Sequence, residues 1–493
     1  MKEQIEKAEA AVHELLENRK DRWYPTFHIA PLAGWMNDPN GLSFFKDRYQ
    51  VYFQHNPYSP VWGPMHWGHV SSSDLVTWRR EPIAFAPSVE EDKDGVFSGS
   101  AVVNDDTLYT YYTGHRWRNG VNEDEGNLQV QMMATSKDGI TFDDKKMIVD
   151  SPEGLLHFRD PKVWKMGETW YMLFGACSAD NRGQVWLYTS DDMETWNFDR
   201  ILFQDPDPKV FMLECPDLFP VGDKWILMYG PMGPDPVGYG SRNGHNAGYV
   251  VGNWAPGEDF EPLTNYRPGD WGHNFYAPQS FEAPDGRRIL FGWMGAFTLP
   301  IVSQNEDGWS GQLTVPREVS LNEDLTWNTK PIAELESLRV STEDLGSFVV
   351  PTNTTQVLVE DAGPMEIELQ VDLEQTTSER VGLLIHKTES GAHTFVGYDD
   401  LAQRVFIDRR LTGHCDRGYR AAPYRGGRKL NLRIFVDNGS IEVFVEGGVE
   451  AVTSFSFPLD GPRSLEISSE SGPIHVDSLK IHRLRSIWEM PDK

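Results

Sequence analysis

A weak internal repeat constrains the fold of this chain more than any other feature. From Trp23 onward, short runs of Tyr, Trp, Phe and Val are broken by Gly, Pro, Asn or Asp, a texture typical of short antiparallel strands. Polar openings recur along this part at intervals of about sixty residues, at Asp38, Ser98, Asp160, Asp217 and Ser280. Repeated four-stranded units are the mark of a β-propeller, and five openings predict five blades.

The length of the chain, 493 residues, exceeds what one hydrophobic core usually serves, so we expect more than one domain. Residues 1–22 are predicted as a short N-terminal helix and residues 23–332 as the five-bladed β-propeller. Residues 333–343 are the predicted linker, and residues 344–493 the predicted C-terminal β-sandwich. The predicted fold class is therefore all-β.

Periodicity supports the two flanking elements. The helical face of residues 1–22 is formed by Ile5, Ala8, Val12, Leu15 and Leu16. In the last part of the chain, residues 365–373 alternate strictly between apolar and polar side chains, as a strand with one buried face does. The turn Asp437-Asn438-Gly439-Ser440 between two apolar runs is a strong hairpin signal. Strands and hairpins without helices predict a sandwich.

Composition narrows the function classes. The formal net charge of −29 argues against nucleic acid or an anionic membrane surface as a partner. The three cysteines, Cys177, Cys215 and Cys415, have neither disulfide-framework nor zinc-knuckle spacing, so reduced thiols and a cytoplasmic protein are expected. The first eight residues are too charged for a signal peptide, and no run of about 18 apolar residues follows. The acidic surface leaves a homo-oligomer open.

Three acidic motifs fall at or just before the openings of blades one, three and four. They are Gly34 to Gly41 with Asp38, His157 to Lys162 with Asp160, and Leu213 to Leu218 with Glu214. The first strands of propeller blades line a common channel, so these acids are expected to converge. Cleavage of a glycosidic bond needs two carboxyl groups in different protonation states. The motifs therefore predict a glycosidase pocket.

Each acid has an expected role and a plainer alternative. Asp38, on a tight Asp-Pro turn with little rotamer freedom, suits an ionised nucleophile, although Asp-Pro and Asn-Gly are ordinary turn formers. Glu214 lies in an apolar run, which would raise its pKa as a general acid requires, or it belongs to a structural ion pair. Asp160 follows Arg159, which would keep it ionised for binding sugar hydroxyls or simply form a salt bridge with it.

Other polar and aromatic residues give weaker signals. Trp62, Trp67, Phe97 and Trp293 stand in turn-rich segments and suit either stacking on a sugar or packing in the propeller core. His55, His66 and His69 lack a carboxylate at a helical offset, so no metal site is predicted.

The three acidic motifs together resemble glycoside hydrolase family 32, the invertase and sucrose-6-phosphate hydrolase family. Trp-Met-Asn-Asp-Pro-Asn-Gly at 35–41, Phe-Arg-Asp-Pro-Lys at 158–162 and Glu-Cys-Pro-Asp-Leu at 214–218 follow the family's order and rough spacing, and the resemblance covers nearly the whole chain. It implies a five-bladed propeller followed by a β-sandwich, no cofactor, and retention of configuration. It further implies Asp38 as nucleophile, Glu214 as acid/base and Asp160 as transition-state stabiliser.

The same resemblance implies which other side chains line a fructose pocket. They are Asn37, Gln54, Trp62, Phe97, Ser98, Arg159 and Trp293. One position departs from the family pattern: Asn274 stands where members often carry Asp, and we expect this change to alter the rim of the site.

The expected activity is hydrolysis of the terminal β-D-fructofuranoside bond of sucrose, a small-molecule sugar, through a fructosyl-enzyme intermediate. Sucrose 6-phosphate and short fructo-oligosaccharides stay open as substrates, with Arg116, Arg118 and Arg242 as the loop cations that could bind a phosphate. The alternatives are a fructosyltransferase, in which a sugar hydroxyl replaces water, and a non-catalytic sugar-binding propeller.

Overall fold

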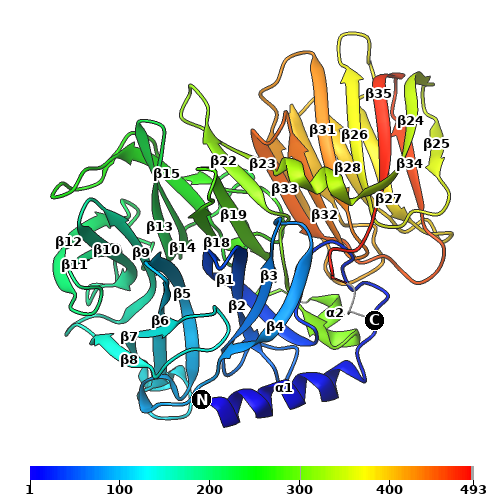
Figure 1. Cartoon of the computed structure of the whole chain (residues 1–493). Helices are drawn as coiled ribbons and strands as arrows, with labels where there is room; N and C mark the ends of the chain where they lie inside the picture. The colour runs from blue at the N-terminus through cyan, green and yellow to red at the C-terminus, as the bar shows by residue number, and fades with distance from the viewer. Residues whose placement is uncertain (300, 490–493) are drawn as a thin grey trace.

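Residues 1–299 and 301–489 are described by the structure, a computed structural model. Their strands form five smaller sheets followed along the chain by two six-stranded sheets. Figure 1 shows the smaller sheets arranged around a common centre and the two larger sheets stacked beside them. The predicted five-bladed β-propeller with a C-terminal β-sandwich is confirmed. Within these two ranges no helix combines the length and the apolar character needed to cross a membrane.

Each blade is an antiparallel sheet whose first strand faces the centre. Blade one contains β1 (Gly34–Phe45), β2 (Arg48–Asn56), β3 (His66–Ser72) and β4 (Trp78–Phe85). Blade two contains β5 (Gly95–Asn104), β6 (Thr107–Trp117), β7 (Asn127–Ser136) and β8 (Lys146–Val149). Blade three contains β9 (His157–Met166), β10 (Thr169–Cys177), β11 (Gly183–Ser190) and β12 (Asn197–Gln204).

The last two blades carry additional short strands. Blade four contains β13 (Met212–Val221), β14 (Lys224–Met232), β15 (Gly248–Asn253), β16 (Glu261–Pro262) and β17 (Arg267–Pro268). Blade five contains β18 (Tyr276–Glu282), β19 (Arg288–Met294), β21 (Gln312–Leu313), β22 (Arg317–Leu321) and β23 (Trp327–Pro331). The five polar openings found in the sequence lie in β1, β5, β9, β13 and β18, and these strands contact one another around the ring.

The ring closes on blade one. Strand β20 (Trp309–Ser310), which follows β19 in the chain, pairs in parallel with the start of β1. A segment much later in the sequence also returns to this blade: Trp78 and Trp488 form a parallel bridge, and the Trp78 N–H donates to the Ile487 carbonyl at 2.7 Å. The blade that begins the propeller is therefore completed by residues from far along the chain.

A Ser-x-Asp sequence recurs in blades one to three, at 72–74, 136–138 and 190–192, and forms the same turn in each blade. Each joins the third strand of a blade to the fourth, and Asp74, Asp138 and Asp192 each accept the backbone N–H groups two and three residues ahead. In blade three these bonds, first from Thr195 and then from Glu194, lower the pKa of Asp192 to about 2. The repeat in the sequence is thus a repeated turn that ends the third strand.

The helices are peripheral. Helix α1 (Lys2–Leu16) lies along blade one, with Ala8 and Val12 buried against Ala33 and Ile83, so the predicted amphipathic helix is confirmed. The other helical elements are short: α2 (Val302–Glu306), η1 (Glu90–Asp92), η2 (Glu123–Glu125) and η3 (Ala333–Leu338).

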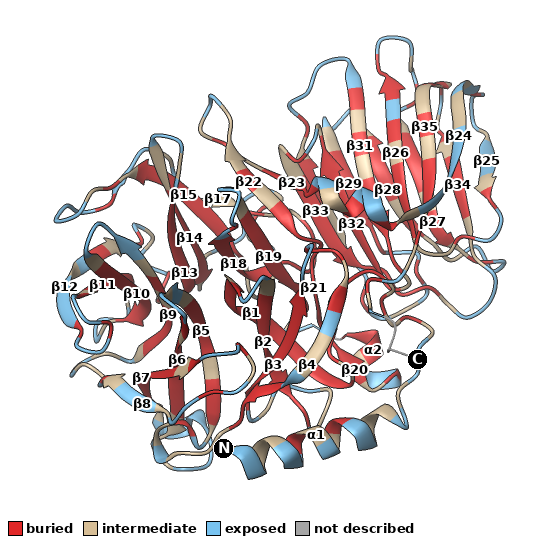
Figure 2. Ribbon diagram, viewed as in Figure 1, coloured by how far each residue is buried: buried red, intermediate tan, exposed pale blue. Residues whose placement is uncertain are grey.

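The sandwich packs two sheets over one apolar core. One sheet has the order β24 (Arg339–Val350), β35 (Ile474–Leu484), β26 (Met365–Asp372), β31 (Lys429–Val436), β32 (Ser440–Val445) and β33 (Glu450–Phe455). The other has the order β25 (Thr355–Val359), β34 (Ser464–Ser469), β27 (Arg380–Lys387), β28 (Thr394–Asp399), β29 (Arg404–Asp408) and β30 (Tyr419–Pro423). Buried apolar residues of both sheets form one cluster, and Figure 2 shows buried segments along the strands of the sandwich.

The predicted linker 333–343 is too long. Only η3 separates β23 from β24, because β24 already pairs with β35 at Arg339, whose Cα partner is Leu484. Residues 340–343, which were predicted as part of the linker, belong to this exposed edge strand.

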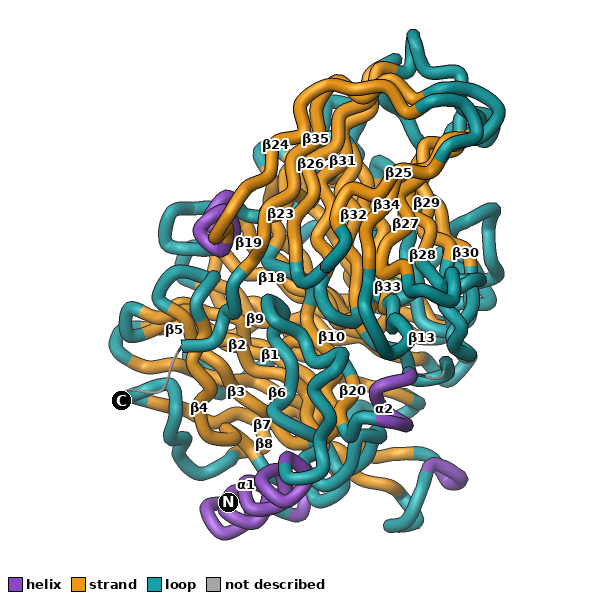
Figure 3. The backbone as a smooth tube through the Cα atoms, turned by 90° about the vertical axis from the view of Figure 1, so that its right-hand side faces the viewer, coloured by secondary structure: helices purple, strands orange, loops and turns teal. Residues whose placement is uncertain are grey.

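A buried ionic cluster joins the sandwich to the propeller. Figures 1 and 3 show the sandwich beside blade five, and β33 contacts β19 and β23. At this boundary His28, which precedes β1, contacts Asp437 at 2.7 Å and Glu442 at 2.9 Å, both from the β31–β32 hairpin. Glu442 also accepts a hydrogen bond from Arg317 of β22 at 2.6 Å. These four side chains are fully buried, as is Asp270, which Arg317 also contacts at 3.1 Å, so each charge depends on an opposite charge beside it.

Candidate active site

The five first strands share a distortion at the same level of the channel. The pairing register shifts at Met36/Pro39, Val96/Gly99, Glu214/Asp217 and Tyr276/Gln279, and in β10 opposite Asp160. Asp160, Cys215 and Ala277 also have positive φ angles, which L-residues rarely adopt. A β-bulge turns a side chain away from its regular direction. The bulges in β1, β9 and β13 contain or adjoin the three predicted acids, which therefore converge.

Asp38 is fixed by three donors. The Ser98 hydroxyl donates to its Oδ2 at 2.6 Å, the Cys215 thiol donates to the same oxygen at 3.3 Å, and Asn37 Nδ2 donates to Oδ1 at 3.0 Å. Asn37 is held in turn by the Trp35 indole N–H at 2.7 Å. Asp38 is 8% exposed, so its carboxylate is almost immobile but reachable from the channel.

Glu214 is paired with a cation. Arg159 Nη2 donates to Glu214 Oε1 at 2.7 Å, and the Tyr276 hydroxyl donates to Oε2. The Arg159 guanidinium is positioned by His157 Nδ1 at 3.0 Å and by Gln129 Oε1 at 3.4 Å. Arg159 therefore bonds Glu214, while its closest approach to Asp160, the neighbour that the sequence suggested, is 4.0 Å.

Asp160 accepts the Cys215 backbone N–H at 2.9 Å, and its own N–H donates to Thr113 Oγ1 at 3.0 Å. Asp160 is 6% exposed. The left-handed backbone at both Asp160 and Cys215 brings these two strands together at this point. Asp160 thus lies on the same strand as Arg159 and joins it to the strand that carries Glu214.

The protonation of the three acids differs from what the sequence predicts. Burial raises the pKa of Asp160 to about 7, because the Arg159 charge does not fully offset the loss of solvent. Burial also raises the pKa of Asp38, against the hydrogen bonds from Ser98 and Asn37. Burial also tends to raise the pKa of Glu214, but the Arg159 charge and the Tyr276 hydrogen bond outweigh burial and lower this pKa. The expectations of a raised pKa for Glu214 and of an Asp160 held ionised by Arg159 are therefore wrong.

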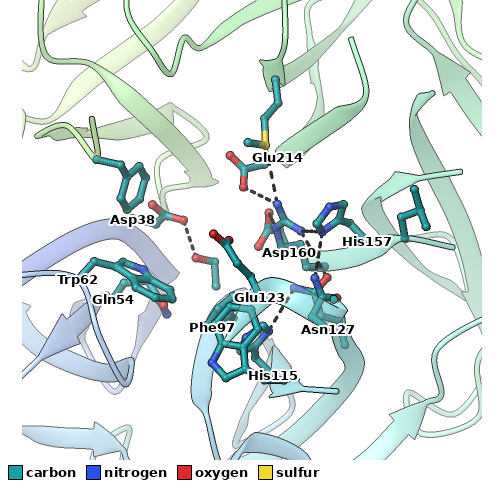
Figure 4. Close-up of a pocket in the computed structure, with 18 of the residues that line it drawn as sticks. Asp38, Gln54, Trp62, Phe97, His115, Glu123, Asn127, His157, Asp160 and Glu214 are labelled. Carbon is teal, nitrogen blue, oxygen red and sulfur yellow. Dashed lines mark hydrogen bonds and ion pairs between the residues drawn. The ribbon is translucent and has the colours of Figure 1, made fainter. Parts of the chain in front are cut away.

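The acids line one cavity of about 620 Å³ at the end of the channel. Figure 4 shows Asp38, Asp160 and Glu214 directed into it from separate strands. Of the ten residues predicted for the site, nine line this cavity: Asn37, Asp38, Gln54, Trp62, Phe97, Ser98, Arg159, Asp160 and Glu214. Phe97 is stacked on His115 with ring centroids 4.0 Å apart, and Trp62, at 40% exposed, forms part of the rim.

Two sequence expectations fail at the boundary with blade five. Trp293 is fully buried and does not line the cavity, because its ring is packed against Trp35, Tyr276 and Phe297. Asn274 does not lie at the rim either. Its Oδ1 accepts the Phe455 backbone N–H at 2.9 Å, which places the side chain in the contact with the sandwich.

Several cavity residues were not found from the sequence. They are His115, Trp117, Glu123, Glu125, Gly126, Asn127, Gln129, Leu155, Leu156, His157, Met232, His245 and Phe297, whereas Arg118, which also lines the cavity, was one of the predicted phosphate candidates. Most lie in or beside loops that follow the second strands of blades, where polar residues are also common for reasons of solubility. Their role depends on which loops border the channel, and no local pattern in the sequence reports that.

The described residues contain no group of three or more His, Cys, Asp or Glu side chains suited to a metal ion. The histidines considered in the sequence bond separately: His55 to the Trp35 carbonyl, His66 to the Pro64 carbonyl and His69 to Gln50. The chemistry available in the cavity is therefore that of carboxyl groups, one buried guanidinium and aromatic rings.

Comparisons with known proteins agree with this architecture. Residues 28–331 match the family model "Glycosyl hydrolases family 32 N-terminal domain", and residues 334–483 match "Glycosyl hydrolases family 32 C terminal". The chain is 42% identical over 465 residues to a sucrose-6-phosphate hydrolase of Escherichia coli, covering 94% of this chain and 96% of the relative. It is 39% identical over 476 residues to a raffinose invertase of Escherichia coli, covering 96% and 97%.

Among solved structures, the fold is similar to that of a GH32 beta-fructofuranosidase of Bombyx mori, a mutant in complex with sucrose. The TM-score is 0.86 at 31% sequence identity, and the match covers 98% of this chain and 99% of the other.

Proposed function

Because the chain belongs to glycosyl hydrolase family 32, we propose that it is a retaining β-fructofuranosidase, an invertase, that hydrolyses the terminal β-D-fructofuranoside bond of sucrose. One observation carries the proposal: Asp38 and Glu214, from blades one and four, line the same cavity in different environments. Two carboxyl groups that differ in their surroundings are what a retaining glycosidase requires. The sugars named for the relatives above support sucrose as substrate.

In the first step, Asp38 attacks the anomeric carbon of the fructosyl unit while Glu214 protonates the bridging oxygen. Glucose leaves and a fructosyl ester of Asp38 remains. In the second step, Glu214 removes a proton from water, the water oxygen replaces Asp38 at the anomeric carbon, and fructose leaves with its original configuration. The three donors on Asp38 hold the nucleophile in place through both steps.

The Arg159–Glu214 ion pair sets a condition on the first step. A carboxylate that accepts from a guanidinium at 2.7 Å is held ionised, whereas the acid must carry a proton. Substrate binding therefore weakens the Arg159–Glu214 contact, because Arg159 then donates hydrogen bonds to the fructose hydroxyls. Once the guanidinium is engaged elsewhere, burial and the nearby Asp38 charge both favour protonation of Glu214.

The remaining cavity residues bind the sugar. Asp160 is proposed to hold fructose hydroxyls and to stabilise the positive charge that develops on the ring. Asn37, Gln54 and Ser98 provide polar contacts around Asp38, and Trp62 and Phe97 offer aromatic faces at the open side. A cytoplasmic location is part of the proposal and is supported by the three free cysteines.

The test is the product analysis of sucrose cleavage. We expect the purified protein to release glucose and fructose in equal amounts, and proton NMR at early times to detect β-fructofuranose before it equilibrates. A fructosyltransferase would instead release more glucose than fructose and form trisaccharides at high sucrose concentration. Absence of cleavage with sucrose, sucrose 6-phosphate and 1-kestose alike would rule the proposal out.

Replacing Tyr276 by Phe should shift the pH profile of kcat/KM to higher pH. The lost hydroxyl hydrogen bond is one of the contacts that lower the pKa of Glu214, so its removal raises that pKa. The two carboxyls titrate together, and raising the pKa of either moves the bell-shaped profile upward. Tyr58→Phe, which removes a hydroxyl from a half-exposed ring outside the cavity, is the matched control. A profile that stays in place or moves to lower pH would contradict the proposed role of Glu214.

A further inference from the structure

The loop between β6 and β7, residues 118–126, borders the open side of the cavity. It contains three consecutive acids, Glu123, Asp124 and Glu125, which form η2. Glu123 and Glu125 line the same cavity as the catalytic acids. Figure 4 shows the Glu123 side chain extending from this loop into the space in front of Asp38 and Asp160.

This acidic loop has a defined conformation. Asn119 Oδ1 accepts the backbone N–H groups of Val121 and Asn122, each at 2.9 Å, and Asn122 Oδ1 accepts that of Asp124 at 3.2 Å. The ends of the loop are joined by the Arg118 N–H, which donates to the Gly126 carbonyl at 3.0 Å. The carboxylates are therefore held at the mouth of the cavity.

Burial identifies the end of the cavity that this loop borders. Asp38, Asp160 and Arg159 lie at the closed end, each less than a tenth exposed, so the sugar ring that is attacked must occupy that end. The leaving sugar then points toward the rim, where Trp62 is 40% and Leu156 49% exposed. Glu123 and Glu125 are exposed residues of the same lining.

The charge at this rim is negative. Within residues 1–299 and 301–489, neither Glu123 nor Glu125 has a cation within 4.0 Å. Two cations line the cavity: Arg159, which is buried and bonded to Glu214, and Arg118, which is exposed on the acidic loop itself. The other two phosphate candidates do not line it: Arg116 lies 3.7 Å from Glu90, and Arg242 donates to the Gly238 carbonyl. Three acids against one arginine leave the loop with a net negative charge.

We propose that Glu123 and Glu125 make the leaving-group end of the cavity select neutral sugars and reject a phosphorylated one. The inference rests on the proposed β-fructofuranosidase activity and names its specificity. A phosphate on the leaving hexose carries nearly two negative charges at neutral pH, and binding would bring it against these carboxylates. The hydroxyls of a neutral hexose instead donate hydrogen bonds to carboxylate oxygens.

The test compares kcat/KM for sucrose and for sucrose 6-phosphate in the wild type, Glu123→Gln and the double variant Glu123→Gln/Glu125→Gln. We expect the wild type to favour sucrose. Each substitution should raise kcat/KM for the phosphorylated sugar about fivefold relative to sucrose, as expected for a dianion several ångströms from a carboxylate in water. In the wild type, added salt should reduce the preference for sucrose over sucrose 6-phosphate, because salt screens exposed charges. In the double variant, salt should have little effect on this preference.

Glu168→Gln is the matched control. It removes the same charge from an exposed residue in the β9–β10 turn, at the end of β9 opposite to Asp160, and should leave the ratio of the two kcat/KM values unchanged. This inference would be overturned if the wild type preferred sucrose 6-phosphate, or if the ratio of the two kcat/KM values were the same in the double variant as in the wild type. Continued release of fructose would then leave the proposed function standing. A wild type that cleaves neither sugar would overturn the proposed function and this inference with it.

Discussion

Asp38→Asn is expected to lower kcat/KM for sucrose by about four orders of magnitude or more, as loss of a nucleophile does in enzymes that form a covalent intermediate. The amide fills the same space between Ser98, Cys215 and Asn37 but cannot form a fructosyl ester. Stability should not fall with activity, because burial raises the pKa of Asp38 and the neutral amide removes a charge from that environment. Initial rates and thermal unfolding of the same preparations give both quantities.

The control is Asp47→Asn, in the exposed β1–β2 turn. Asp47 has a φ of 57°, a conformation that asparagine also tolerates, so this variant loses a carboxylate from the same blade without strain. It should keep wild-type activity. If Asp38→Asn retained more than about a hundredth of the wild-type rate, a group other than Asp38 would have to be the nucleophile.

His28→Gln is expected to destabilise the protein by about 3 to 5 kcal/mol at pH 7, the typical cost of removing one partner from a buried ion pair. The imidazolium lies between Asp437 and Glu442, and the substitution leaves two buried carboxylates with less compensation. The remaining charge partner, Arg317, contacts Glu442 but not Asp437. Denaturant unfolding of both proteins at the same pH measures the difference.

The same residue predicts a pH dependence. Burial lowers the pKa of His28, but the contacts with Asp437 and Glu442 outweigh it and raise the pKa from 6.5 to about 9. A raised pKa in the folded state means that the stabilisation is fully present below pH 6.5 and is lost as the pH rises through about 9. The wild type should therefore lose about 3 kcal/mol of stability over this interval, from the size of the pKa shift. The loss should be absent in His28→Gln.

His13→Gln, on the exposed face of α1, is the control for removal of a histidine. It should leave both the stability and its pH dependence unchanged. Equal unfolding midpoints for wild type and His28→Gln at pH 7 would show that the cluster does not hold the two domains together.

The architecture was predictable because its signals are local and repeated. Each blade begins with a polar opening and contains short aromatic-rich strands, and three blades share a Ser-Asp turn, so a pattern of about sixty residues reports the blade number. The sandwich followed from alternation in β26 and from the hairpin at Asn438-Gly439. The linker was misjudged because the first half of the edge strand β24, Arg-Val-Ser-Thr-Glu-Asp, is mostly polar and lacks the alternation of a strand with one buried face.

The contacts within the site were less predictable because they join distant parts of the chain. The sequence places Arg159 beside Asp160, but the bulge at this point directs the guanidinium to Glu214, 55 positions away. This pairing reverses the expected direction of the pKa shift at Glu214. Trp293 illustrates a different limit: a tryptophan in a turn-rich segment suits a sugar platform or a packed core equally, and only its neighbours decide.

The closure of the ring on blade one has a consequence for biosynthesis. The strand that carries Asp38 leaves the ribosome early, but its parallel partner β20 follows only after residue 308, and the bridge to Trp78 forms only with Trp488. The His28 contacts likewise wait for the β31–β32 hairpin. The nascent chain therefore holds an unfinished first blade through most of its translation. A product interrupted in the sandwich would carry all three acids and β20, but it would lack the Trp488 bridge to blade one.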